Sequence, residues 1–237
     1  MKIVADLHTH TLASGHAYST VNELAAAAAE KGLKALAITD HGPSLPGGPH
    51  IYHFGAMRFI PREICGVRIL LGCEANIIGI DGRIDLPENY LHRLDFVMAG
   101  FHELCGFDAQ GSSRNTEALI NAIHNPCIHA ISHPGNPAFP VDYLAIARAA
   151  AKTGTALEIN NSSFTHSRCG SRPNCEKLAT EIKRFNTLVV LGSDAHIAQN
   201  VGEFSSAIEV VINAGIEEGQ VVNSSLERLL GFLGLME

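Results

Sequence analysis

Short apolar runs alternate with helix-length segments along this chain, and the alternation limits the folds that it can adopt. Seven runs are predicted to be strands, each ending in polar residues: 3–6, 35–39, 68–73, 96–99, 129–131, 156–159 and 188–192. Strands that alternate with helices favour right-handed crossovers and a parallel sheet. About seven such units predict a closed or nearly closed α/β barrel, with an open doubly wound sheet as the alternative. The chain has neither a G-x-G-x-x-G fingerprint nor a P-loop, so nucleotide-binding open sheets lose support.

Segments with the period of an amphipathic helix lie between several of these runs: 21–31, 115–125, 141–153, 174–185, 205–214 and 224–233. The first of them follows Ser19-Thr20 and stops at Gly32, which suits a cap at each end. The segment 77–86 is predicted to be a small hairpin around Asp81-Gly82, inserted into the barrel pattern.

Composition supports one folded domain over residues 1–237. Hydrophobic residues make up 46% of the 237 residues, enough for a substantial core, and no linker or low-complexity tract divides the chain. The longest strictly apolar run is six residues, 24–29, far shorter than a membrane span needs. The first residues show no secretory signal pattern, so we expect a cytoplasmic protein. A net charge of −7 argues against binding a long nucleic acid.

Histidine is more common than either basic residue, and cysteine shows no metal-binding spacing. Thirteen histidines stand beside six lysines and eleven arginines. The six cysteines contain no C-x-x-C pair, which favours reduced thiols over a structural zinc site. Because histidine is the commonest metal ligand and the usual acid–base group near neutral pH, its placement matters most.

Nine potential metal ligands follow the predicted strands or stand at their ends. They are His8, His10, His16, His41, Glu74, His102, His133, Asp194 and His196. In a parallel barrel the carboxyl ends of the strands meet at one mouth, where active sites lie. The spacing of His8 and His10 also places both imidazoles on one face of a strand. The sequence therefore predicts a metal centre at this mouth.

The number of ligands bears on the number of ions. Nine ligands at four per ion exceed two closed sites, and a bridging carboxylate would let three ions share them. Nitrogen-rich ligand sets suit Zn²⁺, Mn²⁺ or Fe²⁺ better than Mg²⁺, and zinc is the leading candidate. A water bound at open positions between such ions has a pKa of about 7, so it supplies hydroxide at neutral pH.

The motifs that carry these ligands resemble the PHP (polymerase and histidinol phosphatase) family of metal-dependent phosphoesterases. They are D-L-H-T-H at 6–10, T-D-H at 39–41, G-x-E at 72–74, H-P at 133–134 and S-D-A-H at 193–196. The stretches I-S-H-P-G-N-P at 131–137 and L-E-I-N-N-S-S-F-T-H-S-R at 157–168 are most similar to the YcdX-type phosphatases of that family. The resemblance runs along almost the whole chain.

The resemblance implies a distorted (β/α)7 barrel, TIM-like and single-domain, with three metal ions. It implies these ligand sets: His8, His10, Glu74 and Asp194 for the first ion; Glu74, His102 and His133 for the second; His16, His41 and His196 for the third. Among them, Glu74, Asp194 and His196 are the residues we expect to matter most in catalysis.

Other residues near the predicted mouth are candidates for supporting roles. The loop after the sixth strand carries Arg168 and Arg172, whose guanidinium groups suit phosphate oxygens, so both are candidate substrate ligands. Asp40 is a candidate to orient a ligand from behind. His50 and His53 lie in a Gly/Pro-rich loop and could line the mouth.

Three further histidines are expected away from the centre. His92 and His124 are expected on the surface, and His129 at the opposite end of its strand from His133.

The leading functional hypothesis is metal-dependent hydrolysis of a small-molecule phosphomonoester by a metal-bound hydroxide. An amidohydrolase-type deacylase also uses a barrel and an early H-x-H, but it would leave His16, His41 and His196 without a role. A non-catalytic metal-binding scaffold is the third hypothesis, and the full ligand set argues against it. A nuclease role is weakened by the net charge. The substrate and the oligomeric state, including a homo-oligomer, stay open.

Overall fold

The strands form one sheet that curls into a nearly closed barrel. A computed structural model describes residues 1–236 of the chain. Seven parallel strands are hydrogen-bonded in this order: β1 (Ala5–Asp6), β2 (Ala35–Ile38), β4 (Val67–Asn76), β5 (Phe96–Gly100), β6 (Ala130–Ile131), β7 (Ala156–Asn160) and β8 (Val189–Gly192). A short strand, β3 (Glu63–Ile64), pairs antiparallel with β4. The order follows the sequence, as right-handed crossovers require.

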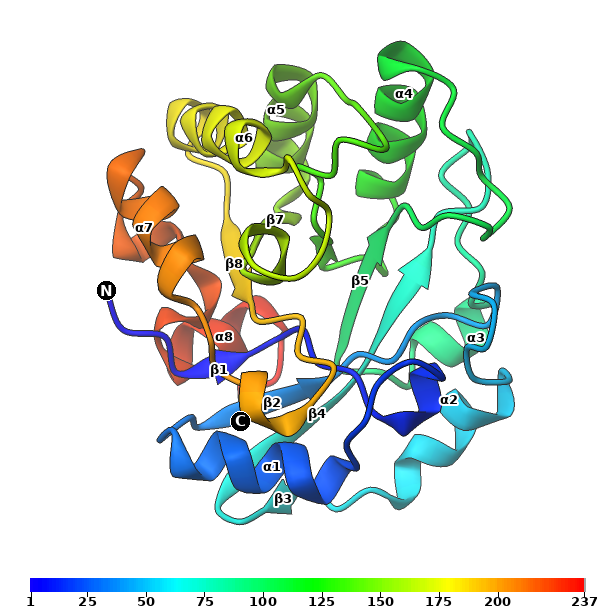
Figure 1. Ribbon diagram of the computed structural model, residues 1–237, viewed down its shortest axis with the longest axis vertical. Coiled ribbons are helices and arrows are strands. Elements are labelled where there is room, and N and C mark those ends of the chain that lie inside the picture. Colours follow the sequence, from blue (N-terminus) through cyan, green and yellow to red (C-terminus); the bar gives the residue numbers. More distant parts are fainter. Residues whose placement is uncertain (237) are drawn as a thin grey trace.

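Helices connect the strands and cover the outside of the barrel (Figure 1). They are α1 (Val21–Glu30), α2 (Tyr52–Ala56), α3 (Glu88–Leu91), α4 (Ser112–Ile123), α5 (Tyr143–Thr153), α6 (Arg172–Phe185), α7 (Ser205–Asn213) and α8 (Leu226–Phe232). The expected caps on α1 are both present. Thr20 and Glu23 form a capping box, in which each side chain bonds the other residue's backbone N–H. Gly32, with a φ of 73°, ends the helix, and its N–H bonds the carbonyl of Ala29. Single 3-10 turns lie between several elements.

The barrel closes between β8 and β1 through loop residues and one buried amide. Thr9 and Ala195 form a parallel bridge just beyond the two strands. Nearer their amino ends, the side chain of Asn223 donates to the carbonyls of Ala5 and Leu191, each at 2.8 Å. Its Oδ1 accepts from the Leu191 N–H at 3.2 Å. The amide thus satisfies backbone groups that a direct strand pair would otherwise pair.

Two apolar regions stabilise this architecture. The larger lies between the sheet and the surrounding helices, with residues such as Leu24, Ile69 and Ile146 fully or almost fully buried. The smaller fills the barrel interior and its amino end: Ala5, Ala35, Ala37, Leu70, Phe96, Met98, Ala130, Ala156, Val190, Val222 and Leu229. Since the alanines leave room for Phe96 and Met98, the interior is packed rather than open.

The barrel prediction is confirmed, and all seven predicted strands are present within a few residues of their expected bounds. The expected hairpin appears as a short turn in which Ile77 pairs antiparallel with Ile84. The sequence did not predict α2, α3 or β3, because elements of two to five residues give no clear periodicity. Helix α4 begins at Ser112, three residues before the expected start. Among residues 1–236, no helix is both long and apolar enough to cross a lipid bilayer.

Candidate metal centre

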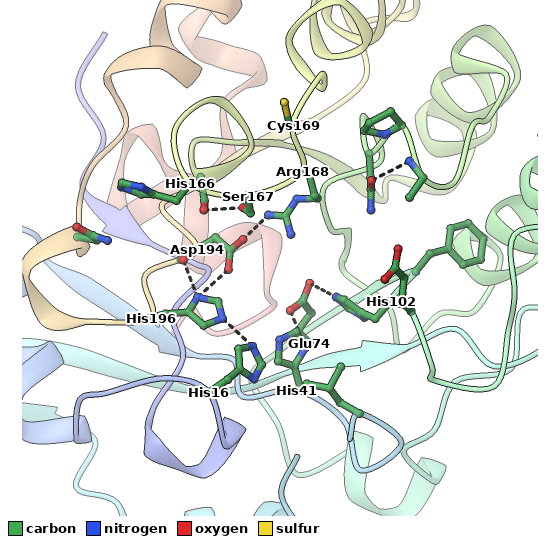
Figure 2. A pocket seen from close by; sticks show the side chains of 18 residues that line it. His16, His41, Glu74, His102, His166, Ser167, Arg168, Cys169, Asp194 and His196 are labelled. Atoms are coloured by element: carbon green, nitrogen blue, oxygen red, sulfur yellow. Dashed lines mark hydrogen bonds and ion pairs between the residues drawn. The ribbon is translucent and has the colours of Figure 1, made fainter. Parts of the chain in front are cut away.

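All nine predicted ligands meet at the carboxyl end of the barrel. Figure 2 shows those that line the pocket: His16, His41, Glu74, His102, Asp194 and His196. His8 and His10 follow β1, His41 follows β2, and Glu74 lies within β4. His102, His133 and the Asp194/His196 pair follow β5, β6 and β8. His133 and Asp194 have positive φ angles of 31° and 55°, a conformation that non-glycine residues rarely adopt. The backbone thus turns sharply at these two positions, where the chain leaves β6 and β8.

Glu74 faces two groups of histidines with its two carboxylate oxygens. Its Oε2 lies 3.1 Å from Nε2 of His8 and 3.5 Å from Nε2 of His10. Its Oε1 lies 3.2 Å from Nε2 of His102 and 2.7 Å from Nε2 of His133. A carboxylate with one oxygen toward each group has the geometry of a bridge between two ions.

Asp194 joins the first of these groups. Its Oδ1 lies 3.5 Å from Nε2 of His8 and 3.3 Å from Nε2 of His10. Donor atoms of His8, His10 and Asp194 all lie within 4.8 Å of one another. The structure therefore brings together the residues expected around the first ion.

The remaining histidines form a group at the rim of the mouth. Nε2 of His16 lies 3.0 Å from Nε2 of His196. Donor atoms of His10, His41 and His196 lie within 4.8 Å of one another, and so do those of His41, Glu74 and His102. His41 thus stands between the rim group and the Glu74 group, whereas the resemblance assigned it to the rim alone.

Hydrogen bonds that involve Nδ1 orient four of the imidazoles. Nδ1 of His8 donates to Oε1 of Glu158 at 2.7 Å, and Nδ1 of His16 and of His196 donate to backbone carbonyls. Nδ1 of His10 lies 3.2 Å from the hydroxyl of Ser14. A proton on Nδ1 leaves the lone pair of Nε2 free, and each Nε2 points into the centre.

Several buried polar atoms at the centre have no hydrogen-bond partner among the described residues. They are Nε2 of His8, Nε2 of His10, Nδ1 of His41, Nδ1 of His102 and Oε2 of Glu74. An unpaired buried polar group is costly, and native proteins rarely keep one without a reason. Nε2 of His8 and Nε2 of His10 both lie within ion-pair distance of Oε2 of Glu74, so this donor set fits bound cations.

The protonation states also suit metal binding. Burial lowers the pKa of His10 and of His133 to about 4, so both imidazoles are neutral at pH 7. Burial would raise the pKa of Glu74, but the surrounding imidazoles, led by His8, hold it well below its usual range. Burial would lower the pKa of His8, yet the carboxylates of Glu158, Glu74 and Asp194 hold it well above the usual value. This concentration of negative charge favours a cation in place of that proton.

Sequence reasoning missed Glu158, which supports two ligands from below. It is buried on β7; its Oε1 accepts from His8, and its Oε2 accepts from the backbone N–H of His133 at 2.7 Å. Gly192 on the adjacent strand makes room, since a Cβ there would collide with Oε1 of Glu158 and lie 2.6 Å from Cβ of His8. The available signal was a carboxylate in the middle of the otherwise apolar run 156–159.

Asp40 supports the centre from behind, as its position beside His41 suggested. The carboxylate accepts from the backbone N–H and hydroxyl of Thr11 and from the hydroxyl of Ser14, at 2.7 to 2.8 Å. Ser14 in turn contacts Nδ1 of His10. His53 lies 3.2 Å from Asp40 through Nε2 and does not line the pocket at the metal centre.

The two candidate arginines differ in where they point. Arg168 lines a cavity of about 730 Å³ above the centre and pairs with Oδ2 of Asp194. Its other contacts, to Asn160 and Ser163, leave Nη1 without a partner among the described residues. Arg172 lies 3.7 to 3.9 Å from Glu209 and Glu176 and over the ring of Phe164, and it does not line the cavity. The geometry therefore supports Arg168 and gives no support to Arg172 as a substrate ligand.

The other histidines lie where the sequence placed them. His92 and His124 are exposed, and His129 accepts from the N–H of Val97 near the start of β5, away from the mouth. His50 is also exposed and does not line the cavity. His166, which the sequence analysis did not single out as a ligand, does line it.

A barrel with such a donor set at its carboxyl end belongs to the class of candidate metal-dependent hydrolases, and comparisons with known proteins identify the family. The PHP domain model matches residues 6–162. A protein from Syntrophotalea carbinolica named "Probable phosphatase" is 53% identical over 235 residues, which cover 99% of this chain and 98% of the relative. A "Probable phosphatase" from Caldanaerobacter subterraneus is 48% identical, covering 98% of this chain and 92% of the relative. The chain belongs to the PHP domain family.

A solved structure supports the fold independently. The histidinol phosphate phosphatase of Lactococcus lactis, crystallised with zinc, L-histidinol and phosphate, matches with a TM-score of 0.62 at 17% identity. The match covers 92% of this chain and 95% of that protein. The likeness confirms the distorted barrel. Family membership and the named relatives indicate a phosphoesterase, a hydrolase of phosphoric ester bonds.

Proposed function

We propose that the protein is a phosphatase that hydrolyses a small-molecule phosphomonoester with three divalent ions, Zn²⁺ being the best candidate. The observation that carries the proposal is Glu74, whose two oxygens face separate histidine groups while a third group lies at the rim. The L. lactis phosphatase, which holds zinc and phosphate on the same fold, is consistent with it.

The ligand sets proposed from the resemblance agree with most of these contacts. His8, His10, Glu74 and Asp194 would hold one ion, and Glu74, His102 and His133 a second. His16, His41 and His196 would hold the third. When bound, the ions supply the positive charge that activates water and stabilises the departing oxygen. Mn²⁺ or Fe²⁺ would also suit these imidazole and carboxylate donors.

The protein's own groups orient the reaction. Glu158 and Ser14 fix the imidazoles of His8 and His10 through Nδ1. Arg168 is anchored to Asp194 and Asn160 and presents Nη1 toward the cavity, so we assign it to a phosphate oxygen. Because that guanidinium is fixed before substrate arrives, binding loses little side-chain entropy.

Two other functions receive less support. An amidohydrolase-type deacylase needs fewer ligands and gives the rim group of His16, His41 and His196 no role. A metal-binding scaffold needs no anchored guanidinium beside the centre, yet Arg168 lies there. The absence of any arginine or lysine other than Arg168 among the described residues that line the cavity also argues against a nucleic-acid substrate.

Metal content and phosphate release test the proposal together. Protein reconstituted with Zn²⁺ and freed of excess metal is expected to hold about three ions per chain and to release inorganic phosphate from p-nitrophenyl phosphate. Elemental analysis and a phosphate assay measure both quantities. Folded protein with one ion or none contradicts the trinuclear proposal, and three ions without hydrolysis of any phosphomonoester contradicts the phosphatase.

The two arginines provide an internal comparison. Arg168→Ala is expected to raise KM for p-nitrophenyl phosphate about tenfold or more, because a charge-assisted hydrogen bond to phosphate is lost. Arg172→Ala removes only exposed contacts and is expected to change KM less than twofold. Equal effects of the two substitutions would contradict the assignment of Arg168.

The cytoplasmic location and the oligomeric state stay predictions. The predicted cytoplasmic location agrees with the state of the six cysteines, since none of them forms a disulfide within residues 1–236.

A further inference from the structure

A second cavity, of about 270 Å³, adjoins the metal centre between the loops that follow β7 and β8. Every described side chain that lines it is polar. Five of them have no hydrogen-bond partner for their side chain among residues 1–236: Thr165, His166, Gln199, Asn200 and Ser205. We call it the polar cavity. Its free hydroxyl, amide and imidazole groups are available to a ligand.

The polar cavity is continuous with the larger one above the metal ligands. Ser162, His166, Asp194 and Asn200 line both. Asp194 is a proposed metal ligand and the partner of Arg168, so the polar cavity begins beside the proposed phosphate position. Figure 2 shows His166, Ser167 and Asp194 together on the side of the pocket away from His102.

The charge on the two cavities suits a single phosphate group. Arg168 is the one arginine or lysine that lines either cavity in the described chain. Glu103 adds a carboxylate to the larger cavity. Glu203 in the polar cavity already pairs with Lys31 at 2.6 Å. A second phosphate would therefore meet negative charge and no free cation.

The phenylalanine, tyrosine and tryptophan side chains do not offer a stacking surface for a nucleobase. Phe101 is the one phenylalanine, tyrosine or tryptophan among the described lining residues. It is 5% exposed and packs against Phe107 and Phe139, with ring centroids 5.0 and 5.1 Å away. A base needs an open ring face, which Phe101 lacks.

We propose that the polar cavity binds the alcohol part of the substrate, and that this part is a polyol: a sugar or sugar alcohol carrying one phosphate. The inference rests on the proposed phosphatase function. Polyol hydroxyls both donate and accept hydrogen bonds, and the amides of Gln199 and Asn200 offer both kinds of group. Hydrolysis breaks the bond between phosphorus and the polyol oxygen. Water supplies the new oxygen on phosphorus and the proton on the released alcohol.

Asn200 provides the sharpest test, because its side chain lines both cavities and has no hydrogen-bond partner within residues 1–236. Asn200→Leu keeps the size and removes the amide. We expect it to raise KM for sugar and sugar-alcohol monophosphates about fivefold, since one hydrogen bond contributes about 1 kcal/mol. KM for p-nitrophenyl phosphate is expected to stay within twofold. Asn89→Leu is the matched control, because Asn89 is exposed on α3 and lines neither cavity.

The wild-type protein, reconstituted with Zn²⁺, is first compared on sugar monophosphates, aryl phosphates and nucleoside monophosphates. We expect kcat/KM to be at least tenfold higher for the polyol class. A preference for aryl phosphates would instead place the alcohol part against Leu45, Pro137 and Ala138 on the other wall, and would overturn the inference. Equal KM changes for all substrates in Asn200→Leu would overturn it as well.

A binding measurement separates this inference from the phosphatase proposal. Calorimetry with a sugar phosphonate, which cannot be hydrolysed, reports on the polar cavity even in protein that releases no phosphate. Tighter binding of the sugar phosphonate than of phenylphosphonate, weakened by Asn200→Leu, supports the inference whatever the turnover. Hydrolysis of p-nitrophenyl phosphate without a polyol preference leaves the phosphatase standing and removes only the polyol assignment.

Discussion

The two ends of the barrel are built from the same strands but differ in what fills them. At the amino end, Phe96, Leu70 and Val190 pack among alanines, and Leu229 of α8 covers them. At the carboxyl end, imidazoles and carboxylates are buried with several nitrogen and oxygen atoms unpaired. The amino end gains stability from removing apolar surface from water, whereas the carboxyl end carries buried polar atoms that cost stability unless a ligand pairs them.

The comparison shows how one fold separates stability from function. Strand pairing runs without a break from β1 to β8, so the apolar end can hold the polar end in place. Substitutions at the carboxyl end should therefore change metal binding and turnover more than folding, and substitutions at the amino end should do the reverse. The following predictions test this separation.

The largest effect is expected for Glu74→Gln. The amide keeps the size but removes the negative charge that faces both His8 and His133. Turnover should fall by about a thousandfold or more, with loss of metal at two of the three proposed sites, because charge stabilisation is lost there. Metal analysis, phosphate release and thermal melting are measured on the variant and its parent. Three retained ions and near-parent turnover would show that Glu74 is not the bridge.

Phe96→Ala tests the amino end. Phe96 is fully buried in the interior cluster, so truncation should lower the free energy of unfolding by about 3–5 kcal/mol. Denaturant unfolding measures the loss. The folded variant should keep its metal content, and a selective loss of metal without lower stability would contradict the separation of the two ends.

A smaller effect is expected from Glu158→Gln, which acts through two ligands rather than on the ions. The amide can still accept from the backbone N–H of His133 but no longer offers a charged acceptor to Nδ1 of His8. Supporting groups of this kind contribute about 10–100-fold in metal affinity. Competition with a chelator measures the affinity, and Glu176→Gln is the control, because Glu176 is exposed on α6. Unchanged metal affinity in Glu158→Gln would contradict the supporting role of Glu158 at the centre.

The last effect to be tested is a pH dependence of stability in the metal-free protein. The pKa of His10 and of His133 is about 4 in the folded chain, against an ordinary value of about 6.5 when unfolded. As pH falls from 6.5 toward 4, these two histidines bind protons in the unfolded chain but stay neutral in the folded chain. The free energy of unfolding therefore decreases in that window.

His8, whose pKa is raised, opposes this trend above about pH 6, because the unfolded chain is there still largely deprotonated at this residue; at lower pH it is protonated in both states. Melting temperatures of the metal-free protein should therefore decrease as pH decreases from about 6 to about 4.5. A flat or rising profile would contradict the buried, neutral state of these imidazoles.

The barrel and most of the centre were predictable from local signals. The alternation of apolar runs and helical segments marked the seven strands, and the ligands stand beside strand ends where a parallel barrel brings them together. Arg168 and Arg172 show what local sequence signals do not predict. The sequence predicts both in one loop. In the structure a positive φ of 50° at Arg168 accompanies its turn toward Asp194, whereas Arg172 begins α6 and points at Glu209.

The sequence by itself determined the order of elements and the chemical character of the mouth, because both depend on residue type and on spacing along the chain. Only the tertiary structure decided which oxygen of Glu74 faces which histidines, that Glu158 lies beneath His8 and His133, and that Asn223 joins β1 to β8. These contacts link residues 25 to 218 positions apart. No local pattern reports them, since they arise only when the strands close into a barrel and the side chains compete for the same small space.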